Sequence, residues 1–596
     1  MKKGFKKFII IIAIIVLIAG IGTGVWLFTN RKDKGNENKE ATNNTAETTS
    51  KYEATGTSKM IEPASSFAGG SGTKADPYQI SSAEELQYFA NLFDSECTSK
   101  EESKKYAKAF FALTEDIEIN TDEEMEKVES EAPTYTWKPI SDRGFVVFEG
   151  SFDGNGHYIS GLFNVSDDKE AYLGLFGETD GADINNLTIK NSYFRGIVEV
   201  RSIGGIVGYS TGTTFENCKV ENISLIGMSS HIGGIVGKAF GNNYSIKNCS
   251  SSGKSVAAEY AYVGGIAGSI YGDCTVENCI NDMNIEGKGN GISAGIVCYA
   301  ESENGPIKVL NCINNGTIKS ENGENGGIIE QMTVSKNDII VEGCKNTGEI
   351  YNDGTVSGGI VAQMAYNTSS SAKQLNCRVT NCQNSGNVTC GKHFSGGIIG
   401  RITPGLEFTY EVSKCENTGN IKGKEVGGIV GDCKFDSSHK DETRRTVKIT
   451  NNKNSGEVSS DASKSIGGII GNIDTYSANS KDVMTIDLCT NTGDLKAKTP
   501  SWVGGIVGKI DESKGEQITI SNCKNSGNFE FSVTENNNQN KEKTSGKDWK
   551  NYAGGIVAVG NANTKLSSNT NTGKLNEEGA SFEGIIFDEE CCYKFE

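Results

Sequence analysis

Apolar residues along most of this chain fall in short alternating runs separated by glycine and asparagine, and no helical periodicity persists. Val, Ile, Thr and Gly dominate these runs, which is typical of β-strands and turns. Between Gly204 and Val557 a five-residue phrase, Gly-Gly-Ile-Val-Gly or a near copy, occurs eleven times. Each copy is followed 14 to 25 residues later by a second phrase, usually Asn-Cys-x-Asn-Ser/Thr-Gly. A period near 30 residues predicts a solenoid, in which each repeat stacks on the previous one.

Three positions of the repeat keep nearly the same residue, which predicts columns of stacked side chains. An unvarying β-branched residue in the first phrase predicts an interior column with a spacing of ~4.8 Å. In the second phrase one position is mostly cysteine, and the position two residues later is asparagine. The columns are Ile206, Ile235, Ile266, Ile296, Ile328, Ile360, Ile398, Ile429, Ile469, Ile506 and Ile556; Cys218, Cys249, Cys279, Cys312, Cys344, Cys382, Cys415, Cys489 and Cys523, with Asn452 and Asn569 in the two remaining places; and Asn314, Asn346, Asn384, Asn417, Asn454, Asn491, Asn525 and Asn571.

The asparagine column has two interpretations. Stacked amides can hydrogen-bond one another and satisfy backbone groups at turns, which we favour. A polar strip that binds a ligand is the alternative. Two strands and a short third strand in each repeat, all parallel, predict an all-β fold: a right-handed parallel β-helix of about twelve coils.

The spacing between the phrases predicts where the extra chain length lies. From Gly-Gly to the cysteine register the spacing grows from 14 residues at Gly204 to 24 at Gly358 and 25 at Gly427. From the cysteine register to the next Gly-Gly the spacing stays at 12 to 15 residues, except after Cys523, where it is 31. Extra length therefore enters at one corner, and segments 363–374 and 432–446 should line one flank. Loops on a rigid scaffold often bind ligands, although neutral drift is the alternative for surface insertions.

The N-terminus carries a membrane-targeting pattern. Four lysines precede 21 uncharged residues, 8–28, which are long enough at ~1.5 Å per residue to cross a membrane as a helix. The lysines favour a cytoplasmic tip and an exported body. We therefore expect an uncleaved single-pass anchor, and a cleaved signal peptide is the alternative.

The rest of the chain divides by composition. A polar segment rich in Asn, Thr, Glu and Lys predicts a disordered linker, and Ser82 begins a capping box that opens an amphipathic helix through Phe93. A second helical stretch, 101–108, follows, and these helices should cap the solenoid. The predicted regions are 1–30, cytoplasmic tip and signal-anchor; 31–68, linker; 69–144, N-terminal cap; 145–587, β-helix; and 588–596, tail.

Charge and cysteine content narrow the classes of function. The chain has 58 Lys and Arg against 76 Asp and Glu, a net charge of −18, so the body is a poor nucleic-acid binder. An exported chain with 17 cysteines suggests disulfides, but side chains in one column point in parallel, so we favour buried free thiols. The sequence contains no Cys-x-x-Cys motif, so the cysteine spacing does not indicate a metal site. Cys591 and Cys592 in the tail are an inert pair or a cross-linking site.

No enzyme signature is found in the sequence. The four histidines form no His-Glu-x-x-His motif, and neither a phosphate loop nor a Gly-x-Ser-x-Gly elbow occurs in its required setting. Asp153-Gly154-Asn155-Gly156 resembles part of a calcium loop but predicts a turn. A β-helix lyase or hydrolase would need carboxylates clustered in a groove. We therefore assign no catalytic, cofactor or metal residue, no cofactor, and no enzymatic activity.

Taken together, these residues resemble bacterial surface proteins built from GLUG-motif repeats. The resemblance covers about residues 70–587 and implies a cell-surface β-helix of the pectate-lyase-like superfold, with adhesion or substrate presentation as the usual role. Similar repeats occur in immunoglobulin-A-cleaving metalloproteases, whose zinc motif is absent from this sequence. The matching segments are Asp76-Pro77-Tyr78-Gln79-Ile80, Leu113-Thr114-Glu115-Asp116-Ile117, Trp137-Lys138-Pro139-Ile140, Phe152-Asp153-Gly154-Asn155-Gly156-His157 and the Gly-Gly-Ile-Val-Gly series.

The functional expectation combines the anchor, the linker and the one-sided growth of the loops. We expect a membrane-anchored extracellular protein that binds a glycan, matrix or cell-surface protein through the long loops on one flank. A carbohydrate-active enzyme on the same scaffold and a passive surface stalk are the alternatives.

Overall fold

The computed structural model describes residues 52–228, 231–257, 260–366, 374–405, 407–435, 444–462, 464–498, 501–511, 514–531 and 552–575, together with the strands Ile586–Asp588 and Tyr593–Lys594. All of them belong to one compact unit, Thr48–Glu596. The predicted signal-anchor at 8–28, most of the predicted linker, and Cys591 and Cys592 lie outside these residues. In the described part of the chain, no helix is both long enough and apolar enough to cross a membrane.

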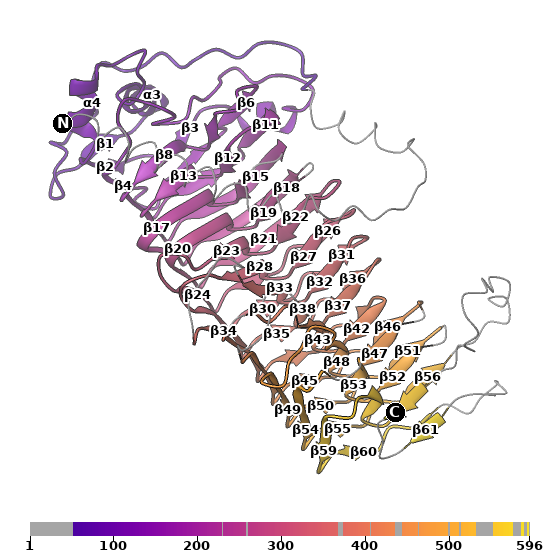
Figure 1. Ribbon diagram of the computed structural model, residues 1–596. Helices are drawn as coiled ribbons and strands as arrows, with labels where there is room; N and C mark the ends of the chain where they lie inside the picture. The colour runs from indigo at the N-terminus through magenta and orange to yellow at the C-terminus, as the bar shows by residue number, and fades with distance from the viewer. Residues whose placement is uncertain are drawn as a thin grey trace, which may run out of the picture. The chain divides into compact units, whose positions relative to one another are not determined.

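Three parallel β-sheets, here called sheets 1, 2 and 3, run through the stacked coils (Figure 1). They contain 26, 23 and 13 strands of the described residues. One full coil contains β16 (His231–Gly233) in sheet 3, β17 (Val236–Lys247) in sheet 1 and β18 (Ser250–Ala257) in sheet 2. Each strand pairs with its equivalents in the coils before and after it, for example His231 with Ser202 and with Tyr262. The predicted parallel β-solenoid is therefore confirmed, while its handedness stays a prediction.

Most coils contain more strands than predicted, because sheets 1 and 2 each break into two short strands. In one such coil, β33 (Val361–Tyr366) and β34 (Asn376–Thr380) lie in sheet 1, and β35 (Gln383–Asn384) and β36 (Val388–Cys390) lie in sheet 2. We call the first of the two strands that each coil contributes to sheet 1, such as β33, together with its equivalents in the other coils, the first half of sheet 1. Besides β17, these equivalents are β8 (Phe176–Asp180), β13 (Val207–Thr211), β20 (Ala267–Glu277), β23 (Val297–Glu301), β28 (Ile329–Val334), β38 (Ile399–Ile402), β43 (Val430–Lys434), β48 (Ile470–Asp474), β53 (Val507–Ile510), β58 (Val557–Gly560) and β62 (Tyr593–Lys594).

Sheet 3 consists of short strands, one from each coil, that lead into the Gly-Gly-Ile phrases. Its strands are β7 (Tyr172–Leu173), β12 (Ser202–Gly204), β16, β19 (Tyr262–Gly264), β22 (Ile292–Ala294), β27 (Glu324–Gly326), β32 (Val356–Gly358), β37 (Phe394–Gly396), β42 (Glu425–Gly427), β47 (Ser465–Gly467), β52 (Trp502–Gly504), β57 (Tyr552–Gly554) and β61 (Ile586–Asp588). The isoleucine column lies at the corner between sheets 3 and 1, and every member is buried. The predicted interior column is therefore confirmed.

The Asn-Cys pair forms the corner between sheets 1 and 2. The residue before each position of the cysteine column has a left-handed backbone, with φ of +53° to +56° at Asn248, Asn311, Asn381 and Asn451. Asparagine tolerates this conformation better than most residues, which accounts for its place in the phrase. The cysteine that follows points inward and is an unpaired, buried thiol throughout the column. Burial raises the pKa of the Cys249 and Cys312 thiols well above the usual value, so they remain protonated.

The asparagine column forms a continuous hydrogen-bonded ladder inside the solenoid. Each Nδ2 donates to Oδ1 of the asparagine in the next coil at 2.7–2.8 Å, from Asn281 through Asn571. The same nitrogen also donates to the carbonyl of the glycine two residues later, such as Gly419 at 2.8 Å from Asn417. Ser251 begins the ladder by donating to Asn281 Oδ1 at 3.0 Å. The predicted amide stacking is confirmed, and it accounts for these side chains without a ligand.

The two phrases of the repeat fit together across the interior. A Cβ atom on Gly397, the second glycine of its phrase, would lie 2.5 Å from Cγ of Asn417 and 2.1 Å from the carbonyl oxygen of Gly428. Neither contact is possible, so only glycine fits between the ladder and the next coil. The Gly-Gly phrase and the asparagine ladder therefore require each other.

Three helices belong to the N-terminal cap: α3 (Ala83–Asn91), α4 (Lys100–Tyr106) and α5 (Asp122–Glu126). Ser82 caps α3 by accepting a hydrogen bond from the backbone N–H of Glu85, as predicted, whereas the reciprocal capping box is found at α5. Strands β1 (Tyr78–Ile80) and β2 (Phe110–Leu113) of this region extend sheet 1. The solenoid sheet thus begins inside the predicted cap, and β62 continues it into the predicted tail.

Residues 52–68, which composition placed in the linker, pack on the cap instead. Bridges join Thr55 to Glu131 and Lys59 to Tyr135. The Tyr52 hydroxyl donates to the carbonyl oxygen of Val128, and its ring packs against the apolar cluster that contains Val128, Phe163, Tyr193 and Ile226. Tyr52 thus attaches this mostly polar segment to the outer face of sheet 2, while the buried Ile61 and the partly buried Phe67 pack against the main core. Composition does not reveal these contacts.

Candidate binding surface

Aromatic side chains gather on the outer face where sheet 3 meets the first half of sheet 1. They alternate with inward residues such as Ile232 and Ala239, because successive side chains of a strand point to opposite faces. All are partly exposed. We call them the aromatic strip: Tyr172, Tyr209, His231, Phe240, Tyr262, Tyr271 and Tyr299, from β7, β13, β16, β17, β19, β20 and β23.

The rings of the strip contact one another from coil to coil. His231 stacks on Tyr262 with centroids 5.1 Å apart and 13° between the planes. Tyr299 lies 5.6 Å from both Tyr262 and Tyr271, and Phe240 lies 6.1 Å from Tyr271. Burial lowers the pKa of His231 to about 3, so its imidazole is neutral and lies 2.7 Å from the Ser269 hydroxyl through Nδ1. These five rings therefore form an uncharged, connected surface.

Lys238 projects into this surface from β17. Its Nζ lies 5.0 Å from the centre of the Tyr271 ring, and in register it lies between Tyr209 and Ser269. Among the described residues no carboxylate pairs with it, and burial together with the nearby Arg201 lowers its pKa. A part-buried ammonium next to aromatic faces gains a cation–π attraction, but its three N–H donors lack an anionic partner.

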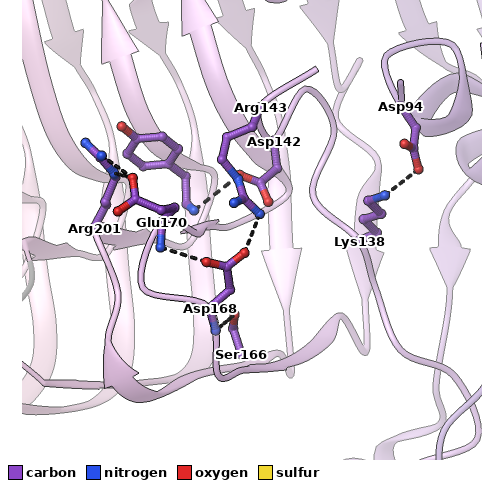
Figure 2. A network of polar contacts seen from close by, with 9 residues as sticks. Asp94, Lys138, Asp142, Arg143, Ser166, Asp168, Glu170 and Arg201 are labelled. Atoms are coloured by element: carbon purple, nitrogen blue, oxygen red, sulfur yellow. Dashed lines mark hydrogen bonds and ion pairs between the residues drawn. The ribbon is translucent and has the colours of Figure 1, made fainter. Parts of the chain in front are cut away.

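Figure 2 shows a network of ion pairs that includes Arg201. The Arg201 guanidinium lies 5.9 Å from the centre of the Tyr172 ring, at the N-terminal end of the strip. Arg201 Nε lies 2.7 Å from Glu170 Oε2, and Arg143 Nη2 lies 2.7 Å from Asp168 Oδ2. Asp142 joins the network by accepting a hydrogen bond from the Tyr172 backbone N–H. The side chains of Arg143 and Arg201 are each paired with carboxylates, so the network holds the turn that precedes β7.

The middle of this face contains two neighbouring carboxyl groups. Glu330 occupies the fifth position of its phrase, where most copies have glycine, and it is 1% exposed with neither oxygen hydrogen-bonded. Glu324 is also buried and accepts a hydrogen bond of 2.8 Å from Thr355. Burial, with a smaller contribution from Glu324, raises the pKa of Glu330 well above its usual value. Both groups are shielded, so this pair offers no open acid–base site to a polymer at the surface.

The insertions predicted from spacing enter between the two halves of sheet 1, and not at a corner as expected. In β17 and β20 the halves form one continuous strand, whereas β33 and β34 are separated by residues 367–375. The predicted segments 363–374 and 432–446 begin in β33 and β43, and their central parts, 367–373 and 436–443, lie outside the described residues. After these insertions Arg445 forms a buried ion pair with Asp482, with Nη2 and Oδ2 2.6 Å apart.

No site residue was predicted from the sequence, and the aromatic strip was missed. The signal is weak because strip residues lie about 30 positions apart and share the outward columns with other residue types. It is nevertheless present: His231 and Tyr262 come two residues before the first glycine of their phrases, and Tyr209 comes five residues after its own. Comparing the residues at these two positions, two before and five after the first glycine of each phrase, would have found most of the strip.

Comparisons with known proteins agree with this repeat. The model of the GLUG motif matches residues 228–257, which include β16, β17 and β18 and so make up one coil. A candidate Gly-rich membrane protein of Evansella cellulosilytica is 30% identical over 160 residues, covering 27% of this chain and 15% of that protein. Halomucin of Haloquadratum walsbyi is 30% identical over 176 residues, covering 28% of this chain and 2% of that protein.

This chain thus matches only a small part of either relative. Among solved structures, a candidate immunoglobulin A1 protease from Bacteroides ovatus is 18% identical, with a TM-score of 0.30 over 66% of this chain and 87% of that chain. Names of the two relatives suggest a surface protein. The motif match and the stacked coils together identify the chain as a parallel β-solenoid that carries the GLUG motif.

Proposed function

We propose that this protein is an extracellular surface protein that binds a glycan along the aromatic strip. The main observation in support of glycan binding is the row of partly exposed rings, which the parallel strands hold in register. Apolar ring faces suit the C–H faces of sugar rings, and binding sites commonly combine such faces with a few polar groups. The GLUG motif and the names of the relatives support a place at the cell surface.

The elongated segments remain part of this proposal. They leave sheet 1 from the ends of strands whose earlier equivalents carry the strip, such as β33 after β23 and β28. A polymer lying along the strip would therefore run toward these segments. The single-pass anchor at 8–28, with the body outside the cell, completes the proposal and rests on the sequence alone.

A glycan array probed with the full-length protein in detergent tests this function. We expect binding to a subset of glycans, and Tyr271→Ala should weaken it about tenfold, because a ring face of ~60 Å² contributes about 1.5 kcal/mol. Tyr351→Ala is the matched control, since Tyr351 is 42% exposed on sheet 2, away from the strip.

Three results would count against the proposal. Absence of binding to any glycan would favour a passive stalk. Equal losses in the Tyr271 and Tyr351 variants would show that the strip has no special role. Release of reducing or unsaturated sugar ends from a bound polysaccharide would indicate a carbohydrate-active enzyme instead.

A further inference from the structure

Lys238 differs from the other basic residues on the face formed by sheet 3 and the first half of sheet 1. Arg201 pairs with Glu170, Arg401 Nε lies 2.9 Å from Asp432 Oδ2, and Lys509 Nζ lies 2.5 Å from Asp511 Oδ1. No carboxylate of the described residues pairs with Lys238, although its Nζ lies 5.0 Å from the centre of the Tyr271 ring. A cation left unpaired on a face where the others are neutralised indicates that its partner comes from outside the chain.

The chemistry of that partner follows from the neighbours of Lys238. Desolvation penalises a lone ammonium, so an anion that also fills the space next to the rings would be favoured over water. The rings of Tyr209, Phe240 and Tyr271 lie on neighbouring strand positions and offer faces for a flat apolar surface. A sugar that carries a carboxylate provides both parts: an anionic group for Nζ and a ring face for the aromatic groups.

The charges along the strip limit how many anionic groups can bind. Glu178 lies two coils before Lys238 in the same column, at ~9.6 Å for a coil spacing of ~4.8 Å, and Glu301 follows Tyr271 in the adjacent column. The spacing between Glu178 and Lys238 is close to the Debye length of ~8–10 Å, and the chain as a whole carries a net charge of −18. A polymer with a carboxylate on every sugar would be repelled at the positions next to Lys238.

We infer that Lys238 binds the carboxylate of a single acidic sugar within an otherwise neutral glycan, while the ring of that sugar packs on the aromatic strip. This inference rests on the proposed function, because it names the ligand class of the same surface. The ammonium donates hydrogen bonds to the carboxylate, and no covalent step is involved.

The test compares two sugars that differ only at the carboxyl group. Binding of the full-length protein to a glucuronic-acid-terminated oligosaccharide is measured against the same oligosaccharide with terminal glucose. We expect about tenfold tighter binding of the acidic form, the usual scale of one charge-assisted hydrogen bond. In Lys238→Met the preference should vanish while the neutral sugar still binds, which also shows that the variant is folded.

Two further variants complete the design. Lys238→Arg should keep the preference because it keeps the charge, and Lys509→Met should keep it because that ammonium already has a partner. Equal binding of the two sugars by the wild type would overturn the inference and leave the proposed function intact. Tighter binding of a polyuronate than of the singly acidic probe would also overturn it. Failure of both sugars, and of every other glycan, would instead refute the proposed function.

Discussion

Replacing Asn417 by alanine tests whether the asparagine ladder stabilises the solenoid. Asn417 is fully buried and makes three side-chain hydrogen bonds. Its Nδ2 donates to Gly419 O at 2.8 Å and to Asn454 Oδ1 at 2.7 Å, and its Oδ1 accepts from Asn384 Nδ2 at 2.8 Å. Alanine would leave one amide N–H and two carbonyl oxygens buried without partners in three successive coils.

The expected loss of unfolding free energy follows from the number of buried polar groups that lose their hydrogen-bond partner. Each buried polar group without a partner costs about 1–3 kcal/mol, and the three are not fully independent, so we expect a loss of about 3–5 kcal/mol. A solenoid is stabilised mainly by contacts between neighbouring coils, so the loss should concentrate near the substitution. Amide hydrogen exchange should therefore accelerate most between about residues 384 and 454, and less at either end.

Two comparisons make this prediction refutable. Asn420 lies in the same coil but is exposed, and its Oδ1 accepts one bond of 3.1 Å from the Glu457 N–H, so Asn420→Ala should change exchange little. Asn417→Ala combined with Asn454→Ala should cost less than the sum of the single changes by at least ~0.5 kcal/mol, because the two residues share a hydrogen bond. Strict additivity, or equal effects at Asn417 and Asn420, would refute the ladder as a source of stability.

Three other measurements test the core and the buried charges. With iodoacetamide and mass spectrometry, the exposed Cys97 should react in the native protein while Cys312 stays protected until unfolding; a disulfide within the column would contradict this. Because burial raises the pKa of Glu330 above its ordinary value of 4.5, folded stability should fall as pH rises above that value. Glu330→Gln should flatten the change in thermal midpoint between roughly pH 4 and pH 8, and an unchanged slope would refute it. Arg445→Met should cost about 3–5 kcal/mol by leaving Asp482 unpaired, and adding Asp482→Leu should recover much of it, as measured by thermal unfolding.

The interior of the solenoid could be predicted because each inward position meets its own equivalent in the next coil. A side chain that suits one coil must suit all of them, so isoleucine and asparagine repeat at fixed positions, and the columns can be read directly from the sequence. The fit between Gly397 and Asn417 shows why the two phrases occur together, although the sequence presents them as separate signals. The left-handed residue before the cysteine column, which is asparagine in most coils, also follows from local chemistry, and a closer reading of Asn-Cys would have indicated it.

Other features depend on contacts that do not repeat. Tyr52 belongs to a polar segment, and its packing near Phe163 and Tyr193 depends on an apolar patch more than 100 residues later in the chain. The site of the insertions was predicted only in part: spacing located them between the two phrases, but the break inside sheet 1 becomes visible only when β17 is compared with β33. Outward positions such as Tyr209 and Lys238 are equivalent in register yet chemically unlike, so the repeat marks them only weakly.

The division between inward and outward positions accounts for how one scaffold can support a variable binding face. Both halves of sheet 1 pair independently with the coils before and after them, so an insertion between β33 and β34 breaks no ladder hydrogen bond. Doubling the length of such a loop costs only about 0.6 kcal/mol, far less than the cost expected from losing one ladder asparagine. Selection for a ligand can therefore change the strip and the elongated segments while the columns stay constant. If this is correct, substitutions at Tyr271 or Lys238 should change glycan binding without changing hydrogen exchange around Asn417, and the reverse should hold for Asn417→Ala.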